Sequence, residues 1–264
     1  MDNPFDEAFT GFTAFTDPEA TRANVADSGA TKPKEPSAHV RYHSNVIQGS
    51  EEWLAMRCGL LTASEMKLVI TPTLKAAAND KERAHVAELA AQRITKYVEP
   101  HYVSDDMLRG HDDEIEATNL YSKNYAPVEA VGFITNDRFG FTIGYSPDAK
   151  LIGKNAGIEN KSRRQKFQVD TICNLEMPSD YVIQLQTGLL VSEWDWIDFN
   201  SYSGGLPMVT LRIWPDPVIQ DAIVNVAGEC ERRICERIAR YHEVLASDAL
   251  LIPTERRVEV EMYV

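Results

Sequence analysis

The sequence lacks two features that would place the protein in or across a membrane. No run of about 18 apolar residues occurs, so no membrane span is expected. The first residues, MDNPFDEAFTGF, are acidic and lack the basic and apolar regions of a signal peptide, which makes the cytosol the expected location. The remaining composition, 44% hydrophobic and 25% charged, is that of an ordinary globular protein.

Cysteine is scarce and irregularly spaced. The four cysteines, Cys58, Cys173, Cys230 and Cys235, form no C-x-x-C pair, which disfavours a zinc ribbon or a redox motif. An iron–sulfur cluster needs four thiolates brought together, and this spacing argues against one. We therefore expect buried, reduced thiols.

Positive charge is also in short supply. The 27 lysines and arginines are outnumbered by 40 acidic residues, giving a net charge of −13. Because phosphates are bound mainly by Lys and Arg, this balance argues against a broad nucleic-acid surface. It leaves room for a local basic groove or a metal-bearing site on an acidic protein.

Two regions differ in composition. Residues 1–40 are rich in Thr, Ala, Asp, Ser and Pro, which predicts a disordered or partner-binding arm with a linker at 28–38. The arm carries four phenylalanines at the spacing of a short docking helix, namely Phe5, Phe9, Phe12 and Phe15. The alternative is a tail without function. Residues 41–264 are expected to form one folded domain.

The folded region shows helical patterns before, between and after strand patterns. Helices are predicted at 50–59, from Thr62 onward, and at 80–98, 106–126, 178–191 and 216–246. The helix at 106–126 carries its apolar residues at helical spacing: Leu108, Ile115, Ala117, Leu120 and Tyr121. Strands are predicted at 130–137, 139–153, 157–162, 194–202 and 208–215. This order predicts an α/β (α+β) fold with a small central mixed sheet and helices on both faces.

Two acids and a lysine lie on consecutive predicted strands. Strand alternation puts Glu159 and Lys161 on one face and Asn160 on the other, and pairing across the intervening turn brings Asp148 towards Glu159. Two carboxylates suit Mg²⁺, and the backbone oxygen of Asn160 could add a ligand. Lys161 could then orient or activate water and stabilise phosphate charge. The alternative is a charged hairpin facing solvent.

This cluster resembles the P-D…E-x-K signature of nucleases, as Pro147-Asp148…Glu159-Asn160-Lys161. Four blocks in the same order make the resemblance more specific: EEWLAMRCGLLTASEM, GHDDEIEA, SPDAKLIGKNAGIENK and YVIQLQTGLLVSEWDWIDFNSY. Together they resemble the phage lambda exonuclease / YqaJ-type viral recombinase family. The resemblance implies a restriction-endonuclease-like core.

The resemblance also assigns roles to acidic and amide side chains. It implies that Asp148 and Glu159 are metal ligands, that Lys161 is the catalytic lysine, and that Glu114 completes the carboxylate cluster. The alternative for Glu114 is an acid on the solvated face of its helix. Gln184, in the family's Gln-x-Gln helix, is implied to lie near the scissile phosphate or the attacking water. Gln186, the second glutamine of that helix, is expected to be structural.

A phosphate pocket is predicted in the first block. If Thr62 begins a helix, its free N–H groups attract an anion, and Ser64 and Arg57 add a hydroxyl and a guanidinium. The resemblance implies that this anion is the 5′-phosphate of DNA. The alternative is that Thr62 merely caps a helix and Arg57 pairs with Glu51 or Glu52.

The chain departs from the family pattern around the lysine. Ala149 stands where the family often has Gly, and Asn160 where it often has an apolar residue; the side chain of Asn160 is therefore expected to be free to vary. The densest basic run, with Arg163, Arg164 and Lys166, follows the lysine. We expect it to contact the DNA backbone or to form a solvated turn.

The resemblance implies a Mg²⁺-dependent deoxyribonuclease, with Mn²⁺ as a substitute. It would degrade the 5′-ended strand of linear double-stranded DNA and leave 3′ overhangs for phage-type homologous recombination. A ring-shaped homotrimer, a single-strand annealing protein as partner, and the cytoplasm of a bacterium or phage-infected host are implied as well. The alternatives are a same-core nuclease of different polarity, an endonuclease, or a non-catalytic DNA- or protein-binding module.

Overall fold

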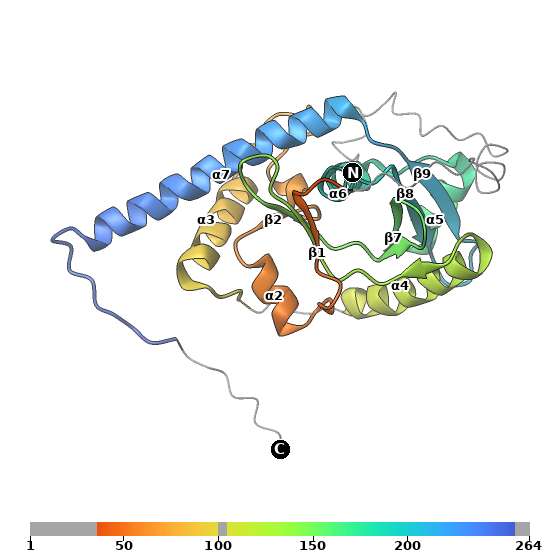
Figure 1. The fold of residues 1–264 in the computed structure, drawn as a ribbon, viewed down its shortest axis with the longest axis horizontal. Coiled ribbons are helices and arrows are strands. Elements are labelled where there is room, and N and C mark those ends of the chain that lie inside the picture. Colours follow the sequence, from red (N-terminus) through yellow and green to blue (C-terminus); the bar gives the residue numbers. More distant parts are fainter. Residues whose placement is uncertain (1–35, 100–104, 257–264) are drawn as a thin grey trace, which may run out of the picture.

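A computed structural model describes residues 36–99 and 105–256 of the chain (Figure 1). Most of the predicted N-terminal arm, including its four phenylalanines, lies outside the described residues. The division into an arm and a domain at residue 40 therefore stays a prediction. Within the described ranges, no helix is both long enough and apolar enough to cross a membrane.

The strands of the described residues form two mixed sheets. The smaller sheet, with β2 parallel to β5, has the order β1 (Val40–Tyr42), β4 (Ile134–Asn136), β5 (Ile143–Tyr145), β2 (Leu61–Thr62). The larger sheet, with β7 parallel to β8, has the order β3 (Val128–Glu129), β6 (Ala149–Leu151), β7 (Ala156–Ser162), β8 (Trp196–Tyr202), β9 (Val209–Ile213).

The strand predicted at 139–153 is divided between the two sheets. β5 ends at Tyr145 and β6 begins at Ala149, and the break contains Pro147. Proline has no N–H to donate to a strand ladder, so the chain leaves one sheet there and enters the other. The mixed α/β class is confirmed, with the strands divided between two mixed sheets. The break places Asp148 at the junction of the two sheets.

Six α-helices in the described residues flank the sheets: α2 (Glu51–Arg57), α3 (Asp80–Thr95), α4 (Asp105–Asn124), α5 (Gln165–Asn174), α6 (Val182–Ser192) and α7 (Pro217–Leu245). Polar side chains cap α2, α3 and α7 at their N-termini, as the sequence predicts for Ser50 and as Asn79 and Asp216 also show. Helix α5 was not predicted. Helix α7 runs beside α3 along one long edge of the molecule (Figure 1).

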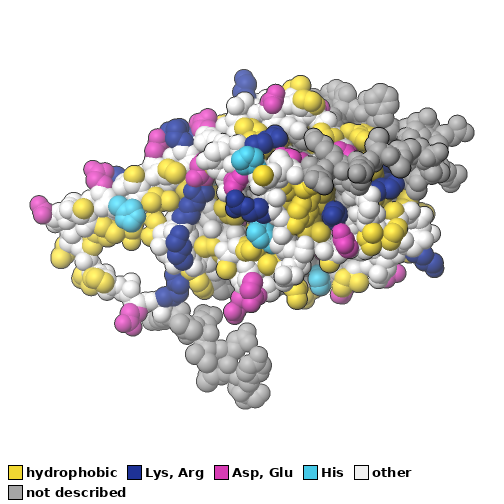
Figure 2. Space-filling model, viewed as in Figure 1, with side chains coloured by type: hydrophobic (Ala, Val, Ile, Leu, Met, Phe, Trp, Pro, Cys, Tyr) yellow, Lys and Arg dark blue, Asp and Glu magenta, His cyan; other side chains and the backbone are white. Residues whose placement is uncertain are grey.

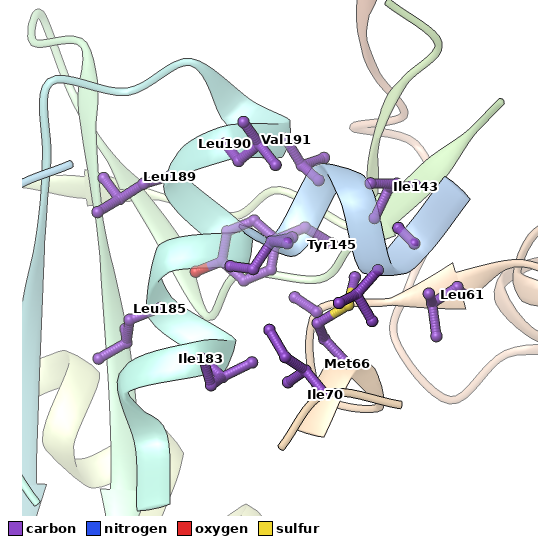
Figure 3. Packing of buried hydrophobic residues seen from close by; sticks show 14 of the residues in the cluster. Leu61, Met66, Ile70, Ile143, Tyr145, Ile183, Leu185, Leu189, Leu190 and Val191 are labelled. Carbon is purple, nitrogen blue, oxygen red and sulfur yellow. The ribbon is translucent and has the colours of Figure 1, made fainter. Parts of the chain in front are cut away.

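Helix α6 lies between the two sheets and contacts β4, β5 and β8 (Figure 1). Every residue of this fully described helix is buried except Gln184. Its apolar side chains pack with residues from both sheets and from the segment around Met66, and Tyr145 lies in the middle of this cluster (Figure 3). The main core is therefore built around a helix that has a single non-buried position.

The helix predicted from Thr62 is wrong. Thr62 lies in β2, the N–H of Ala63 continues the pairing to Gly144 of β5, and a 3₁₀ turn at Met66–Leu68 follows. The carboxylate of Glu65 accepts from the N–H and the hydroxyl of Thr62 at 3.2 and 2.6 Å, so the capping-box spacing is used, but on a strand end. Pairing with β5 outweighs the local helix signal.

Two expectations about exposure are met only in part. Cys230 is buried, but Cys173 and Cys235 are exposed free thiols, so burial holds for one of these three. In α4, Leu108 and Ile115 are exposed, whereas Tyr121 is buried against the larger sheet. Ala117 is buried as well, so only part of the apolar pattern of α4 faces the core.

On the molecular face shown in Figure 2, basic side chains form a narrow row in the left part of the view and are otherwise interspersed with acidic side chains and apolar patches. Among the residues that the structure describes, this face carries no broad basic surface. Any contact with an anionic polymer on this face would have to be local.

Candidate active site

Strand β7 holds Glu159 and Lys161 on the same face. It lies between β6 and β8 in the larger sheet, and Lys161 Nζ is 2.8 Å from Glu159 Oε1. The side chain of Glu159 is buried, with an exposed fraction of 2%. Because side chains alternate along a strand, this contact follows directly from the E-x-K spacing.

Asp148 lies opposite Glu159. Ala149 of β6 pairs with Ile158 of β7, so Asp148, which precedes β6, lies opposite Glu159. The backbone N–H of Asn160 donates a hydrogen bond to Asp148 Oδ2. Burial raises the pKa of Asp148 well above its ordinary value, and the negative charge of Glu159 raises it further. The two acids therefore share one poorly solvated space.

Glu114 on α4 faces the same space. It is half-buried, and burial is the largest cause of its raised pKa; the ammonium group of Lys161 lowers this pKa and the carboxylate of Glu159 raises it. The pKa of Glu114 therefore responds to the charges of both β7 residues. The carbonyl of Glu114 accepts from Asn160 Nδ2 at 3.4 Å, so this part of α4 lies against β7.

Gln184 and Gln186 on α6 have different partners. Gln184, the non-buried residue of the helix, donates from Nε2 to Glu159 Oε1. Gln186 is fully buried; it donates to the carbonyl of Trp214 at 2.9 Å and accepts from the N–H of Asp216 at 2.8 Å. Gln186 therefore attaches α6 to the start of α7, a structural contact as expected, whereas Gln184 reaches the acidic cluster.

Sequence reasoning missed Tyr145. Its hydroxyl donates to Glu159 Oε2 at 2.8 Å, and its side chain is 1% exposed. Burial and the adjacent carboxylate raise the pKa of Tyr145 well above its ordinary value, so the phenol stays a donor. The alternation of β5 signals a buried aromatic residue three positions before Asp148, but its contact with Glu159 depends on how the two sheets meet.

The side chain of Asn160 is not free to vary, contrary to expectation. It is 1% exposed, and its Nδ2 donates to Thr118 Oγ1 at 2.8 Å and to the carbonyl of Glu114 at 3.4 Å. Its Oδ1 accepts from Asn200 Nδ2 at 2.8 Å, and Asn200 in turn accepts from Thr210. This buried chain of polar contacts joins β9, β8 and β7 to the helix that carries Glu114.

The donor atoms of the cluster are of the kind that hard cations prefer. Carboxylate oxygens come from Asp148, Glu159 and Glu114, and burial and mutual repulsion raise the pKa of Asp148 and Glu114. In a strand, the N–H and C=O of one residue point to the same neighbour, so the carbonyl of Asn160 points towards the side of Asp148. A divalent cation would relieve the repulsion between these oxygens.

The acidic cluster is not yet gathered into a complete ligand cage. Within residues 36–99 and 105–256, no three His, Cys, Asp or Glu side chains are already arranged to hold a metal ion. Both oxygens of Glu159 have protein donors, namely Lys161 and Gln184 on Oε1 and Tyr145 on Oε2. The residues therefore fit a hard divalent cation in donor chemistry, and binding would exchange some of these contacts.

The residues of the predicted phosphate pocket do come together. Arg57 donates to Thr62 Oγ1 at 3.2 Å and to Glu65 Oε1 at 3.3 Å, and Thr62 Oγ1 is 3.3 Å from Ser64 Oγ. The guanidinium also lies over the ring of Trp53, 4.4 Å from its centroid. Arg57 therefore pairs with Glu65, not with the acids at the start of α2, and side chains rather than helix N–H groups form the cluster.

Trp53 links this pocket to the acidic cluster. Its Nε1 donates to Ser146 Oγ at 2.9 Å, and Ser146 lies two residues before Asp148. Helix α2, which carries Arg57, is thereby attached to the break between β5 and β6. The predicted phosphate pocket and the acidic cluster are therefore joined through this hydrogen bond.

The basic run after Lys161 begins helix α5 rather than a solvated turn. Arg163 donates to Tyr181 Oη at 3.0 Å and lies over the rings of Tyr181 and Phe167, at 5.4 and 5.2 Å. Arg164 is the N-cap residue of α5 and is exposed. Arg163 therefore lines the approach to Lys161, which itself lies 5.7 Å from the Tyr181 ring centroid.

Comparison with known proteins identifies the family. The model of the YqaJ-like viral recombinase domain matches residues 52–195, more than half of the chain. No curated protein matches the chain.

Solved structures show the same relationship. An alkaline exonuclease (LHK-Exo) from Laribacter hongkongensis has 28% identity and a TM-score of 0.62, with 75% of this chain and 100% of that chain covered. LHK-Exo in complex with dAMP has 30% identity, a TM-score of 0.62 and the same coverage. A phage-related exonuclease from Haemophilus somnus 129PT shares the fold at 13% identity and a TM-score of 0.51, with 69% and 96% covered.

These similarities confirm the predicted α/β class with a restriction-endonuclease-like core. The matched family model spans α2, the acidic cluster and α6, the elements that bring together the residues described above. The chain belongs to the YqaJ-like viral recombinase family.

Proposed function

We propose that this protein is a divalent-metal-dependent exonuclease that degrades the 5′-ended strand of linear double-stranded DNA and leaves a 3′ overhang for homologous recombination. Its family and its similarity to solved exonucleases support the coarser statement that it is a DNA nuclease of the phage exonuclease type. One observation carries the proposal: Glu159 is buried beside Asp148 and bonded to both Lys161 and Gln184.

Lys161 is proposed to act as a cation. Burial lowers its pKa, but the carboxylates of Glu159 and Asp148 raise it more, so the net shift is upward and the ammonium stays charged. A protonated lysine donates hydrogen bonds and does not accept a proton. Lys161 would therefore orient the attacking water and stabilise the negative charge that develops on the phosphate.

The metal is proposed to be Mg²⁺, with Mn²⁺ as a substitute. Asp148, Glu159, Glu114 and the backbone carbonyl of Asn160 would hold it. A bound divalent cation supplies Lewis-acid stabilisation of phosphate charge and lowers the pKa of bound water. The chain's own contribution is to keep the carboxylates oriented, through the hydrogen bond of Gln184 to Glu159 and that of the Asn160 N–H to Asp148.

The end of the DNA strand is proposed to bind at α2. Arg57, Thr62 and Ser64 would bind the terminal 5′-phosphate, with the guanidinium held in place by the ring of Trp53. The phosphate would have to replace Glu65 as the anionic partner of Arg57. A phosphate-selective pocket attached to the break that carries Asp148 gives a physical basis for cutting from the 5′ end.

The remaining features of the proposal rest on the basic run, on the composition of the arm and, for the trimer and the annealing partner, on the family resemblance. Arg163 and Arg164 would contact the DNA backbone next to the cluster. The chain would form a ring-shaped trimer around DNA and act in the bacterial or host cytoplasm with a single-strand annealing protein. The N-terminal arm, residues 1–40, would bind a partner or remain disordered beside the nuclease domain at 41–264, so its deletion should leave nuclease activity intact.

Strand polarity is tested with linear duplex DNA labelled at the 5′ or the 3′ end, with Mg²⁺ or EDTA. We expect Mg²⁺-dependent release of the 5′ label as the first product, faster from 5′-phosphate than from 5′-hydroxyl ends. Early release of the 3′ label would contradict the polarity, and cleavage of closed circular DNA would indicate an endonuclease. A wild-type protein that binds DNA without cutting it would be a non-catalytic binding module.

A further inference from the structure

We propose that Tyr145 is a positioning residue of this site, whose hydroxyl fixes the Glu159 carboxylate in the orientation needed to bind a divalent cation. The inference rests on the proposed function, since it concerns the same carboxylate. It assigns a role to a residue outside the P-D…E-x-K pattern. Tyr145 would act through Glu159, without touching the DNA or the reacting phosphate.

The geometry around Glu159 supports this role. The Tyr145 hydroxyl donates to Oε2 at 2.8 Å, while Lys161 and Gln184 both donate to Oε1. Donors from β5, β7 and α6 therefore hold the two oxygens from different directions. Three bonds of this kind fix the plane of the carboxylate, and such partners of a metal ligand set its orientation and affinity.

The phenol ring is itself held in place. A Cβ atom at Gly188 would lie 2.8 Å from Cζ of Tyr145, so α6 can approach the ring because residue 188 is glycine. On another side, Trp194 packs edge-on at 6.1 Å between centroids. Figure 3 shows Tyr145 within the apolar cluster, with its hydroxyl oxygen directed towards helix α6.

Gly188 also connects Tyr145 to Gln184. The two α6 residues are four positions apart, which places them on the same face of the helix. One face of α6 therefore supplies both a donor to Oε1 and the surface that positions the donor to Oε2. This arrangement gives a reason for glycine in the middle of a buried helix, where it otherwise costs about 0.5–1 kcal/mol relative to alanine.

A purely structural role is the competing explanation, and the chain contains a matched example of it. Tyr121 is also 1% exposed, and its hydroxyl donates to Asp198 Oδ2 at 2.6 Å. Asp198 is paired with Arg212 through two hydrogen bonds and belongs to no part of the proposed site. Tyr121→Phe therefore removes the same group from a similar buried carboxylate contact without disturbing Glu159.

The test compares wild type, Tyr145→Phe and Tyr121→Phe by direct calorimetric titration with Mn²⁺ and by thermal unfolding. We expect Tyr145→Phe to weaken Mn²⁺ binding by about tenfold or more, as outer partners of metal ligands commonly do. Tyr121→Phe should bind Mn²⁺ like wild type, although both variants lose a buried hydrogen bond. Gly188→Ala, which forces the ring to move, should weaken Mn²⁺ binding in the same direction.

The Mn²⁺ concentration that gives half-maximal nuclease activity should rise in Tyr145→Phe by the same factor as the dissociation constant. Equal Mn²⁺ affinity in wild type and folded Tyr145→Phe would overturn the inference, even if the wild type is an active nuclease. Equal weakening in Tyr121→Phe would also overturn it, because the effect would then be general destabilisation. If Tyr145→Phe alone weakens Mn²⁺ binding but the wild type cuts no DNA, the positioning role stands and the proposed function fails.

Discussion

Gln184 donates a hydrogen bond to Glu159 from a helix whose other residues, throughout Val182–Ser192, are all buried. Helix α6 thus serves as the centre of the core and sends one side chain to the acidic cluster. A rigid, tightly packed element is a suitable support for a group that must hold a carboxylate at a fixed angle. Mutations on this helix can therefore distinguish residues that stabilise the core from residues that act in the site.

The pair Gln184 and Gln186 provides such a separation. Gln184→Ala should lower nuclease activity by about 10- to 100-fold with little change in stability, because it removes a donor to Glu159 from a partly exposed position. Gln186→Ala should do the reverse, since it leaves the Trp214 carbonyl and the Asp216 N–H without their partner and costs about 1–3 kcal/mol. Urea unfolding and initial rates on linear duplex DNA measure both; a Gln184→Ala enzyme with full activity would contradict this assignment.

Asp148 should destabilise the metal-free protein at neutral pH. Its pKa is raised in the fold, by burial first and by Glu159 next, so its stabilising contribution is present at acid pH and is lost as pH rises through the raised value. In EDTA, we expect the unfolding midpoint of Asp148→Asn to exceed that of wild type increasingly from about pH 5 to about pH 8, by about 2–4 °C per kcal/mol.

Metal should reverse this order. Added Mg²⁺ should stabilise the wild type more at about pH 8 than at about pH 5, because the ionised carboxylates bind the cation. It should have little effect on the stability of Asp148→Asn. Asp148→Asn should also lose nuclease activity. An Asp148→Asn protein that is less stable than wild type in EDTA at the upper pH would show that the carboxylate is not strained by its neighbours.

Arg57 should confer preference for a 5′-phosphate. Arg57→Ala should reduce the ratio of rates on 5′-phosphorylated and 5′-hydroxyl duplex by about tenfold or more, since a charge-assisted hydrogen bond to phosphate contributes about 1.5–3 kcal/mol. Arg41, an exposed arginine paired with Asp137, supplies the matched control, Arg41→Ala. Equal loss of rate on both ends in Arg57→Ala would indicate a general DNA contact instead.

The buried amide of Asn160 should be needed for stability. Asn160→Leu keeps a similar volume but removes the acceptor of Asn200 Nδ2 and the donor to Thr118 Oγ1, at a cost of about 1–3 kcal/mol. Asn124→Leu, at an exposed position on α4, should change stability by less than about 0.5 kcal/mol. Chemical denaturation of both variants measures this. An unchanged free energy of unfolding in Asn160→Leu would mean that the polar contacts of Asn160 do not contribute to stability.

The parts of the site that depend on local periodicity could be predicted from the sequence. The two-residue spacing of Glu159 and Lys161 fixes a shared strand face, and a short hairpin register then sets Asp148 against Glu159. The position of Gln184 follows only from the resemblance, because the helical pattern of α6 is apolar on all sides. Periodicity cannot say which polar residue of a buried helix points to a site.

The parts that failed depend on contacts between distant segments. Thr62 has the spacing of a helix cap, but pairing of β2 with β5 holds it in a strand. In α4, Ala117 and Tyr121 are buried, but Ile115 of the same apolar pattern is exposed. Tyr145 meets Glu159 only because the break at Pro147 brings two sheets together, and no local pattern encodes that meeting.

The central claim is that Lys161 and the acids around it form a metal-dependent nuclease site. The most direct measurement is the single-turnover rate of cleavage of 5′-phosphorylated linear duplex in saturating Mg²⁺ by wild type and Lys161→Ala. Lys150→Ala, on neighbouring strand β6 and paired with Glu129, is the control. We predict a loss of about 100-fold or more for Lys161→Ala, full activity for Lys150→Ala, and none for wild type in EDTA. Undiminished cleavage by folded Lys161→Ala, or by wild type in EDTA, would contradict the account.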